Sequence, residues 1–305
     1  MNYQQILDTI ATEYLSMQST GKVASYIPEL SNIDPQKFGM HLYCINSGHY
    51  SFGDNNERFS IQSISKVFAL TRAMLLMNDT ELFARVDVEP SGDPFNSLVQ
   101  LEYENGIPRN PFINAGALVI SDILISQLDN PKEDFLSFIH SLTGTTSINI
   151  NPKVFASEKA YSHRNAALLN LMKAFGNITN DIETVLDFYI FQCSIEMSCK
   201  ELSTAFMIYA NGGKRLSDEH QIVPPQKVKR INAIMQTCGF YDEAGEFSFR
   251  VGLPGKSGVG GGIVAIHPNQ YTVTVWSPPL NPKGNSELGM YALERLTTLT
   301  GFSIF

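Results

Sequence analysis

The pattern Ser-x-x-Lys at Ser63 and Lys66 contains two side chains that together can perform acyl transfer. A serine hydroxyl becomes a nucleophile when a base lies within hydrogen-bond reach, and burial keeps a lysine neutral enough to be that base. Ile64, Val67 and Phe68 recur at three- and four-residue spacing, which predicts a helix that begins near Ser63. Backbone N–H groups at this end of a helix can hold an oxyanion. The pattern alone is short, and in most chains such a pattern is a capping serine beside a solvated lysine.

A second candidate is Lys256-Ser257-Gly258, inside the glycine-rich stretch 252–262. A phosphate-binding loop needs a glycine five residues before Gly255, where this chain has Arg250, and it must open a helix, whereas strand-like residues follow here. We interpret the triplet as the start of a strand whose small residues let a ligand approach the backbone. Ser-x-x-Lys followed downstream by Lys-Thr/Ser-Gly is the pairing of penicillin-recognising serine enzymes. Their Ser-Asp-Asn triplet is absent, and Tyr103-Glu104-Asn105 and Tyr209-Ala210-Asn211 are two candidate substitutes.

These residues need a scaffold, and the hydrophobic patterns predict strands at both ends of the chain with helices between them. Strands are predicted at 38–46, 49–52, 245–251, 261–267 and 271–277, and the last two form a hairpin. Helices are predicted at 3–17, 115–128, 162–175, 181–193, 198–211, 224–238 and 285–300, besides the one after Ser63.

The simplest assembly of these elements is an α+β fold with one antiparallel sheet of about five strands, flanked by helices, and an all-helical part beside it. Residues 1–63 together with 239–305 would form the sheet lobe, and residues 64–238 the helical lobe. Because ligand sites are concave and commonly lie between lobes, we expect the active site in the cleft between them.

The composition limits the class of protein. The 305 residues are 43% hydrophobic and 17% charged, which is typical of a globular chain. A net charge of −8 argues against nucleic acid or an anionic membrane as partner. The four scattered cysteines and six scattered histidines have no metal-ligand spacing, so we expect reduced thiols, no metal and no cofactor. The N-terminus lacks a signal-peptide pattern and no apolar window reaches 18 residues, so a cytoplasmic location is expected.

The chain resembles the serine-dependent glutaminases, in the short form found in bacteria. The resemblance covers most of residues 21–290 and is carried by blocks in the same order: 21–28, 62–66, 110–117, Ser157-Glu158 to Arg164-Asn165, 186–189, 193–196, 239–242, 252–262 and 276–280. It implies a β-lactamase/penicillin-binding-protein-like fold. It also implies hydrolysis of the L-glutamine side-chain amide to L-glutamate and ammonia, with no cofactor, by a homo-oligomer (a dimer or a tetramer).

The resemblance also implies the catalytic roles. Ser63 would be the nucleophile that forms a γ-glutamyl-enzyme, and Lys66 would be its base. Tyr241 would contact the substrate and assist proton transfer. Val259 would give a backbone N–H to the oxyanion hole, together with that of Ser63. Whether Lys66 or Tyr241 carries each proton stays open.

The remaining roles implied by the resemblance are in substrate binding. Tyr26 would contact the amide near Ser63, and the α-amino and α-carboxylate groups would be held by Asn114, Glu158, Asn165 and Tyr189. Glutamine is a zwitterion, and Glu158 is the one acidic residue in this set, so it fits the ammonium through a charge-assisted hydrogen bond. Two alternatives remain: a β-lactamase or D,D-peptidase of the same fold, and a non-catalytic amino-acid-binding or scaffold protein.

Overall fold

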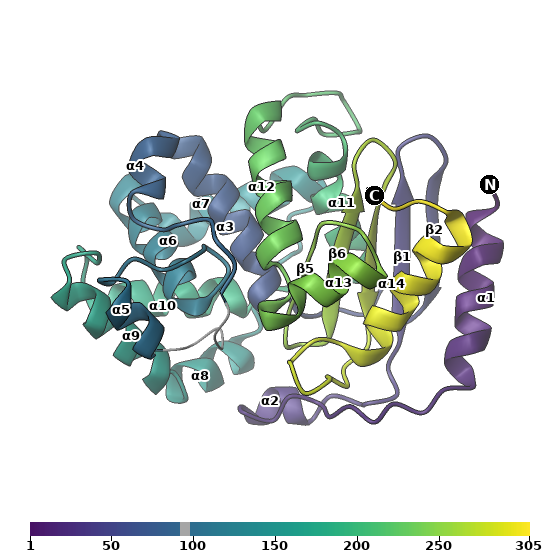
Figure 1. Ribbon diagram of the computed structural model, residues 1–305, viewed down its shortest axis with the longest axis horizontal. Helices are drawn as coiled ribbons and strands as arrows, with labels where there is room; N and C mark the ends of the chain where they lie inside the picture. The colour runs from purple at the N-terminus through teal and green to yellow at the C-terminus, as the bar shows by residue number, and fades with distance from the viewer. Residues whose placement is uncertain (92–97) are drawn as a thin grey trace.

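The central feature of the computed structural model, which describes residues 1–91 and 98–305, is an antiparallel sheet with the strand order β2-β1-β7-β6-β5 (Figure 1). Its strands are β1 (Gly39–Cys44), β2 (Gly48–Gly53), β5 (Gly255–Ser257), β6 (Gly262–His267) and β7 (Tyr271–Trp276). Val275 of β7 pairs with Met40 on one side and with Ile263 on the other, so the first hairpin of the chain is bonded to its last strands. The predicted α+β class and five-stranded antiparallel sheet are confirmed.

Alternating side chains give this sheet two buried faces. Ile263 and Ala265 of β6 pack with α1 (Tyr3–Leu15) and α14 (Glu287–Thr300) in one hydrophobic cluster. Val264 and Ile266 point to the opposite face, which α11 (Cys199–Ala210) covers. On that face the Ser203 hydroxyl donates to Thr274 Oγ1 at 2.9 Å. Both faces are therefore filled, and the sheet is a rigid base for the residues at its ends.

Most helices of the middle of the chain lie beside the sheet, on the left of Figure 1, and α12 lies between them and β5. Their bounds are α3 (Ser65–Leu76), α4 (Asp79–Phe83), α5 (Leu98–Tyr103), α6 (Asn114–Gln127), α7 (Pro131–Thr143), α8 (Pro152–Ala160), α9 (His163–Ala174), α10 (Ile182–Cys193) and α12 (Pro225–Cys238). The short elements outside the main sheet are α2 (Pro28–Ser31), β3 (Phe59–Ser60), η1 (Gln62–Ile64), β4 (Glu196–Met197), η2 (Tyr241–Glu243) and α13 (Ala244–Arg250).

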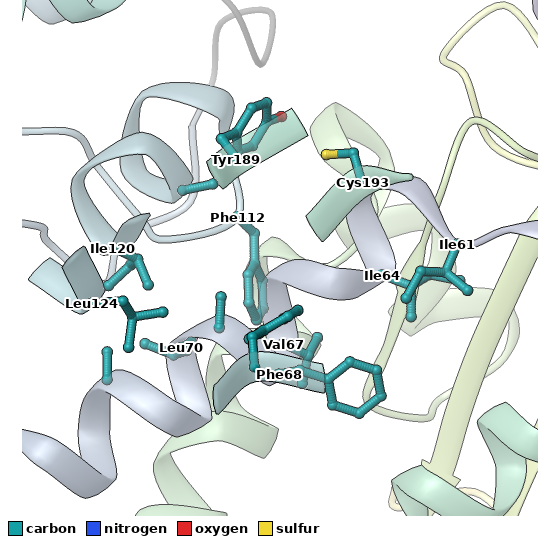
Figure 2. Close-up of a cluster of buried hydrophobic side chains, with 14 of the residues drawn as sticks. Ile61, Ile64, Val67, Phe68, Leu70, Phe112, Ile120, Leu124, Tyr189 and Cys193 are labelled. Carbon is teal, nitrogen blue, oxygen red and sulfur yellow. The ribbon is translucent and has the colours of Figure 1, made fainter. Parts of the chain in front are cut away.

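Helix α3 is at the centre of this helical array. It packs against α6, α7, α10 and α12. Figure 2 shows its buried side chains Val67 and Leu70 among those of Phe112, Ile120 and Leu124. The apolar contacts fix the axis of α3, and with it the direction of any polar side chain that α3 carries at its first turn.

The predicted strand at residues 245–251 is wrong, because this segment is helix α13. Phe247, Phe249 and Val251 alternate, which suggested a strand, but the Phe249 side chain is 91% exposed. Ala244, Phe247 and Val251, at three- and four-residue spacing, are the residues that enter the core. The fifth strand is β5, which ends at Ser257 instead of beginning at Lys256. The other predicted elements are confirmed, with ends that differ by one or two residues.

The described residues give no sign of a disulfide, a membrane-spanning helix or a metal cluster. All four cysteines are buried, and none is in a disulfide. In the part of the chain that the structure describes, no helix has the length and apolar character needed to cross a bilayer. Across the same residues, no three His, Cys, Asp or Glu side chains are grouped so that they could hold a metal ion.

Candidate active site

Ser63 lies in a tight turn between the two-stranded pair β3–β4 and helix α3. The Ile61 N–H donates to Ile195 O at 2.8 Å and anchors the chain just before the turn. Gln62 then has a φ of +48°, a left-handed conformation that is uncommon for a residue other than glycine. Ser63 follows in the single 3-10 turn η1, which leads directly into α3. Strain of this kind persists where the surrounding structure enforces it, and it is concentrated at functional sites.

Lys66 lies one turn after Ser63 and is almost completely buried, with 1% of its surface exposed. Its Nζ donates to Asn114 Oδ1 at 2.8 Å and to Phe112 O at 3.1 Å. Both acceptors are neutral, and burial lowers the pKa of Lys66 from 10.5 to about 8. A neutral amine has two hydrogen atoms and one lone pair. Two donated hydrogen bonds therefore leave its lone pair able to accept a proton.

Ser63 and the predicted binding residues line one cavity of about 370 Å³. All eight residues predicted to contact the substrate are in its wall, and Lys66 is buried behind them. The complete lining is Tyr26, Gln62, Ser63, Asn114, Glu158, Tyr161, Ser162, Arg164, Asn165, Tyr189, Ile190, Cys193, Tyr241 and Val259. A larger hollow of about 570 Å³, between α4 and α12, contains none of the predicted residues. The predicted substrate-contacting residues therefore gather in the smaller cavity.

The first residue of α6, Asn114, connects the base to the far end of the cavity. Its Oδ1 accepts from Lys66 Nζ and also from the Tyr189 hydroxyl at 3.4 Å, and its Nδ2 donates to Asn165 Oδ1 at 3.1 Å. Tyr189 comes from α10, above the start of α3 in Figure 2, with Cys193 one turn further along the same helix. One amide side chain thus links residues of α3, α9 and α10.

A carboxylate lies on another part of the cavity wall. Glu158 Oε1 accepts from the Tyr26 hydroxyl at 2.6 Å, and the same hydroxyl is 3.2 Å from Gln62 Oε1. Burial raises the pKa of Glu158, and its hydrogen bonds with Tyr26 and Gln62 only partly offset this. No cation pairs with Glu158 among the salt bridges of the described residues. A partly buried carboxylate with only neutral partners is suited to a ligand cation.

Tyr241 reaches the cavity from the segment that follows α12. It is the first residue of η2 and has a φ of +54°, which is an outlier for a bulky residue. Burial raises the pKa of Tyr241 to about 12, although the neighbouring Ser63 and Ser257 side chains act in the opposite direction. The Tyr241 hydroxyl therefore stays protonated near neutral pH, within reach of Ser63.

The loop between β5 and β6 places the backbone of Val259 next to the serine turn. A Cβ at Gly258 would be 2.6 Å from Ile61 O, and a Cβ at Gly260 would be 2.4 Å from Ser60 O. Only glycine lets the two backbones come this close. Val259 is held between these two contacts and lines the cavity beside Ser63.

Sequence reasoning missed several residues of the cavity wall. Gln62, Arg164 and Cys193 each lie in a block that carried the resemblance, and the first two are sequence neighbours of predicted residues. For Gln62 and Arg164, adjacency in the sequence to a predicted site residue could have identified them. The two candidate substitutes for the Ser-Asp-Asn triplet are outside the cavity: Tyr103 is exposed at the end of α5, and Tyr209 is buried beside Thr71.

Comparison with known proteins finds relatives that match over most or all of the chain. A model of the glutaminase family matches residues 21–305. A glutaminase from Christiangramia forsetii is 66% identical over 305 residues, which is all of both chains, and one from Saccharophagus degradans is 55% identical over all of this chain and 99% of its own.

Two solved structures align with this chain over nearly its full length. The probable glutaminase YbaS aligns with a TM-score of 0.93 at 31% identity, over 99% of this chain and 97% of its own. A probable glutaminase from Bacillus subtilis aligns with a TM-score of 0.89 at 30% identity, over 99% of this chain and 96% of its own. The predicted β-lactamase-like fold is confirmed by these neighbours. With sequence matches over the full length and a structural match of this quality, the chain belongs to the glutaminase family.

Proposed function

We propose that this protein hydrolyses the side-chain amide of L-glutamine to L-glutamate and ammonia through a serine γ-glutamyl-enzyme. Membership of the glutaminase family supports the substrate. One observation supports the chemistry most strongly: Ser63 faces a cavity whose wall also holds the partly buried carboxylate of Glu158, while Lys66 lies behind it with two neutral acceptors.

The polar wall of the cavity matches the charged groups of glutamine. In this proposal Glu158 binds the α-ammonium group, which provides a cation for this partly buried carboxylate. Asn114, Asn165 and Tyr189 carry amide and hydroxyl donors that can turn to the α-carboxylate once the substrate is bound. Binding both groups fixes the distance from the α-carbon to Ser63, so an amide on a shorter side chain does not reach the nucleophile.

The first chemical step is acylation. Ser63 Oγ attacks the carboxamide carbon while its proton passes to Lys66 Nζ. The carbonyl oxygen becomes an oxyanion that accepts from the backbone N–H groups of Ser63 and Val259. The carbon–nitrogen bond then breaks as the amide nitrogen receives a proton from Lys66 or Tyr241, and ammonia leaves.

The second step is deacylation. A water molecule attacks the γ-carbonyl carbon of the acyl-enzyme and gives up a proton to the same relay. The oxyanion forms again on the N–H groups of Ser63 and Val259. When it collapses, the bond to Ser63 Oγ breaks, the serine regains its proton, and glutamate leaves.

We also propose that residues 1–63 with 239–305 form one lobe, that residues 64–238 form the other, and that the site is the cleft between them. The cavity lining supports this division, because Tyr26, Tyr241 and Val259 come from the first set, whereas Asn114 and Glu158 come from the second. Assembly as a homo-oligomer and a cytoplasmic location stay predictions.

The test is ammonia release from L-glutamine by the wild type and by Ser63→Ala, with L-asparagine as the substrate control and a chromogenic β-lactam as the test of the alternative acyl transfer. We expect release from glutamine alone, and a loss of at least about 10³-fold in the variant, as for other nucleophile deletions. A fully active Ser63→Ala would remove Ser63 as nucleophile. If the wild type is inactive, calorimetric titration with glutamine tests the binding-only alternative.

A further inference from the structure

Lys256 belongs to a motif that the proposed function does not use. Its side chain is completely buried within β5 and is absent from the cavity wall. Its Nζ donates to Ser257 O at 2.7 Å and to Gly239 O at 3.0 Å, and both acceptors are neutral carbonyls. Burial lowers the pKa of Lys256 well below 10.5, and the nearby Lys66 acts in the same direction. A buried lysine without a carboxylate partner is unfavourable for folding, so another contact has to explain it.

That contact is with Tyr241. The Nζ of Lys256 lies 4.6 Å from the centre of the Tyr241 ring, within the range of an N–H or cation contact with an aromatic face. The same Nζ is bonded to Gly239 O, two residues before Tyr241. Gly239 O also accepts from the Ser257 N–H at 3.2 Å. Lys256 therefore holds both the ring and the backbone of the turn that carries it.

The turn needs this support because Tyr241 has a φ of +54°. A bulky residue in the left-handed region persists only where surrounding contacts enforce it. The hydroxyl is at the far end of the ring, so a small rotation of the backbone or about the Cα–Cβ bond moves it away from Ser63. A misplacement of about 1 Å at a reacting group lowers a rate by about 100-fold.

We propose that Lys256 is a positioning residue that holds the Tyr241 ring so that its hydroxyl stays beside Ser63 and can carry a proton during amide cleavage. This inference rests on the proposed function. Lys256 acts through Tyr241 and does not touch the substrate, so its removal should lower kcat and leave KM nearly unchanged. The competing explanation is that Lys256 only stabilises the fold around β5.

A double-mutant cycle separates these two explanations. Lys256→Met, Tyr241→Phe and the double variant are compared with the wild type for kcat and KM of ammonia release. We expect Lys256→Met to lower kcat by about 10- to 100-fold with KM within about threefold, as for a displaced reacting group. In the Tyr241→Phe background the same substitution should lower kcat by less than about threefold, because coupled residues are not additive. The proposal would be overturned if the loss of kcat in the double variant equals the product of the two single losses. It would also be overturned if Lys256→Met has the wild-type kcat.

The matched control is Lys227→Met. Lys227 is a partly buried lysine of α12 that donates to the backbone oxygen of Met74, outside the cavity. Lys227 also forms an ion pair with Asp79 at 3.4 Å. We expect Lys227→Met to lower Tm without a change in kcat, which measures the cost of truncating a partly buried lysine outside the cavity. If Lys256→Met does not fold, Lys256→Gln, which keeps N–H donors for the carbonyls, enters the same cycle.

A crystal structure of Lys256→Met, or of Lys256→Gln, tests the inference without activity. The Tyr241 ring should leave the position that it has above Nζ, and its hydroxyl should separate from Ser63. A ring that stays in place would overturn the positioning role. A wild type that releases no ammonia would overturn the proposed function, while this structural result would still decide whether Lys256 holds the ring.

Discussion

At the scale of single residues, the two hydrogen-bond acceptors of Lys66 carry no charge. An ion pair would hold its proton, whereas an amide oxygen and a backbone carbonyl accept hydrogen bonds from the neutral amine as well. Its position at the base of the cavity therefore fits a group that takes up and releases a proton within one turnover.

The pH dependence of kcat should report this group. Burial lowers the pKa of Lys66 to about 8, so its neutral form is present above that pH and is lost as pH falls through it. We expect kcat to fall about tenfold for each pH unit below this midpoint. Steady-state rates from pH 6 to 10, at saturating glutamine, measure it. A kcat that is flat between pH 6 and 9 would contradict Lys66 as the base.

Glu158 should act on KM. We expect Glu158→Gln to raise KM by about 10- to 100-fold, because a hydrogen bond to a charged group is worth about 1.5–3 kcal/mol, with a smaller change in kcat. Glu294→Gln, a carboxylate paired with Arg250 outside the cavity, is the control. If KM is the same in Glu158→Gln and the wild type, the ammonium is bound elsewhere.

The same carboxylate predicts a second pH effect. Burial raises the pKa of Glu158. As the solution is acidified, Glu158 is therefore protonated at a higher pH than a solvated glutamate. KM for glutamine should therefore rise towards acid pH, and Glu158→Gln should remove that rise. A wild-type KM that is constant down to pH 4.5 would contradict an ionised Glu158 in the complex.

At the scale of elements, the β5–β6 loop is held against the serine turn by glycines. Gly260→Ala would place its Cβ 2.4 Å from Ser60 O, so the two backbones must separate. We expect a loss of stability of about 1–3 kcal/mol and a loss of kcat of about 100-fold, through displacement of the Val259 N–H. Thermal unfolding and ammonia release measure the two effects, and an active, stable Gly260→Ala would contradict the oxyanion role of this loop.

The control for this prediction is Gly245→Ala, which also tests helix α13. A Cβ at Gly245 meets no atom within 4 Å, and the residue lies inside a helix. Alanine should therefore raise stability by about 0.4–1 kcal/mol and leave kcat unchanged. Destabilisation by alanine here would argue against the helix.

The sequence predicts most elements because their apolar spacing matches one period clearly, as in β6, β7 and α14. It fails at residues 245–251, where a short segment with alternating aromatics fits both periods, and only burial shows that Phe249 faces solvent. The site residues were predicted from the resemblance; those expected to contact the substrate line one cavity, and Lys66 is buried behind it. The contact between Lys256 and Tyr241 could not be predicted, because it depends on the left-handed turn at Tyr241 and on the register of β5.

At the scale of the whole molecule, the two ends of the chain are joined. Helices α1 and α14 pack together, and Arg295 donates to both carboxylate oxygens of Glu13 at 2.7 Å, while the Tyr291 hydroxyl donates to Oε2 at 2.9 Å. From its bidentate geometry we expect this surface ion pair to contribute to stability.

Glu13→Gln should lower the stability of the protein by about 1 kcal/mol and Tm by about 1–3 °C, with no change in kcat. The Arg295 hydrogen bond lowers the pKa of Glu13, so this stabilisation is present above the unfolded-state pKa and is lost as pH falls through the lower folded value. Wild type and variant should therefore differ at pH 7 and differ less in acid. An equal difference at pH 7 and in acid would show that the effect is not electrostatic.

The central position of β7 also has a consequence for synthesis on the ribosome. β1 pairs with β7, so the N-terminal hairpin keeps an unpaired edge until more than two hundred further residues have been added. Such an edge can bind other chains, and pairing over this separation in sequence is slow. The nascent chain also carries Ser63 and Lys66 long before Tyr241 and Val259 exist. A released fragment that ends before β5 would therefore hold the proposed nucleophile without the Val259 N–H of the proposed oxyanion hole, and we expect activity only after the last strands close the sheet.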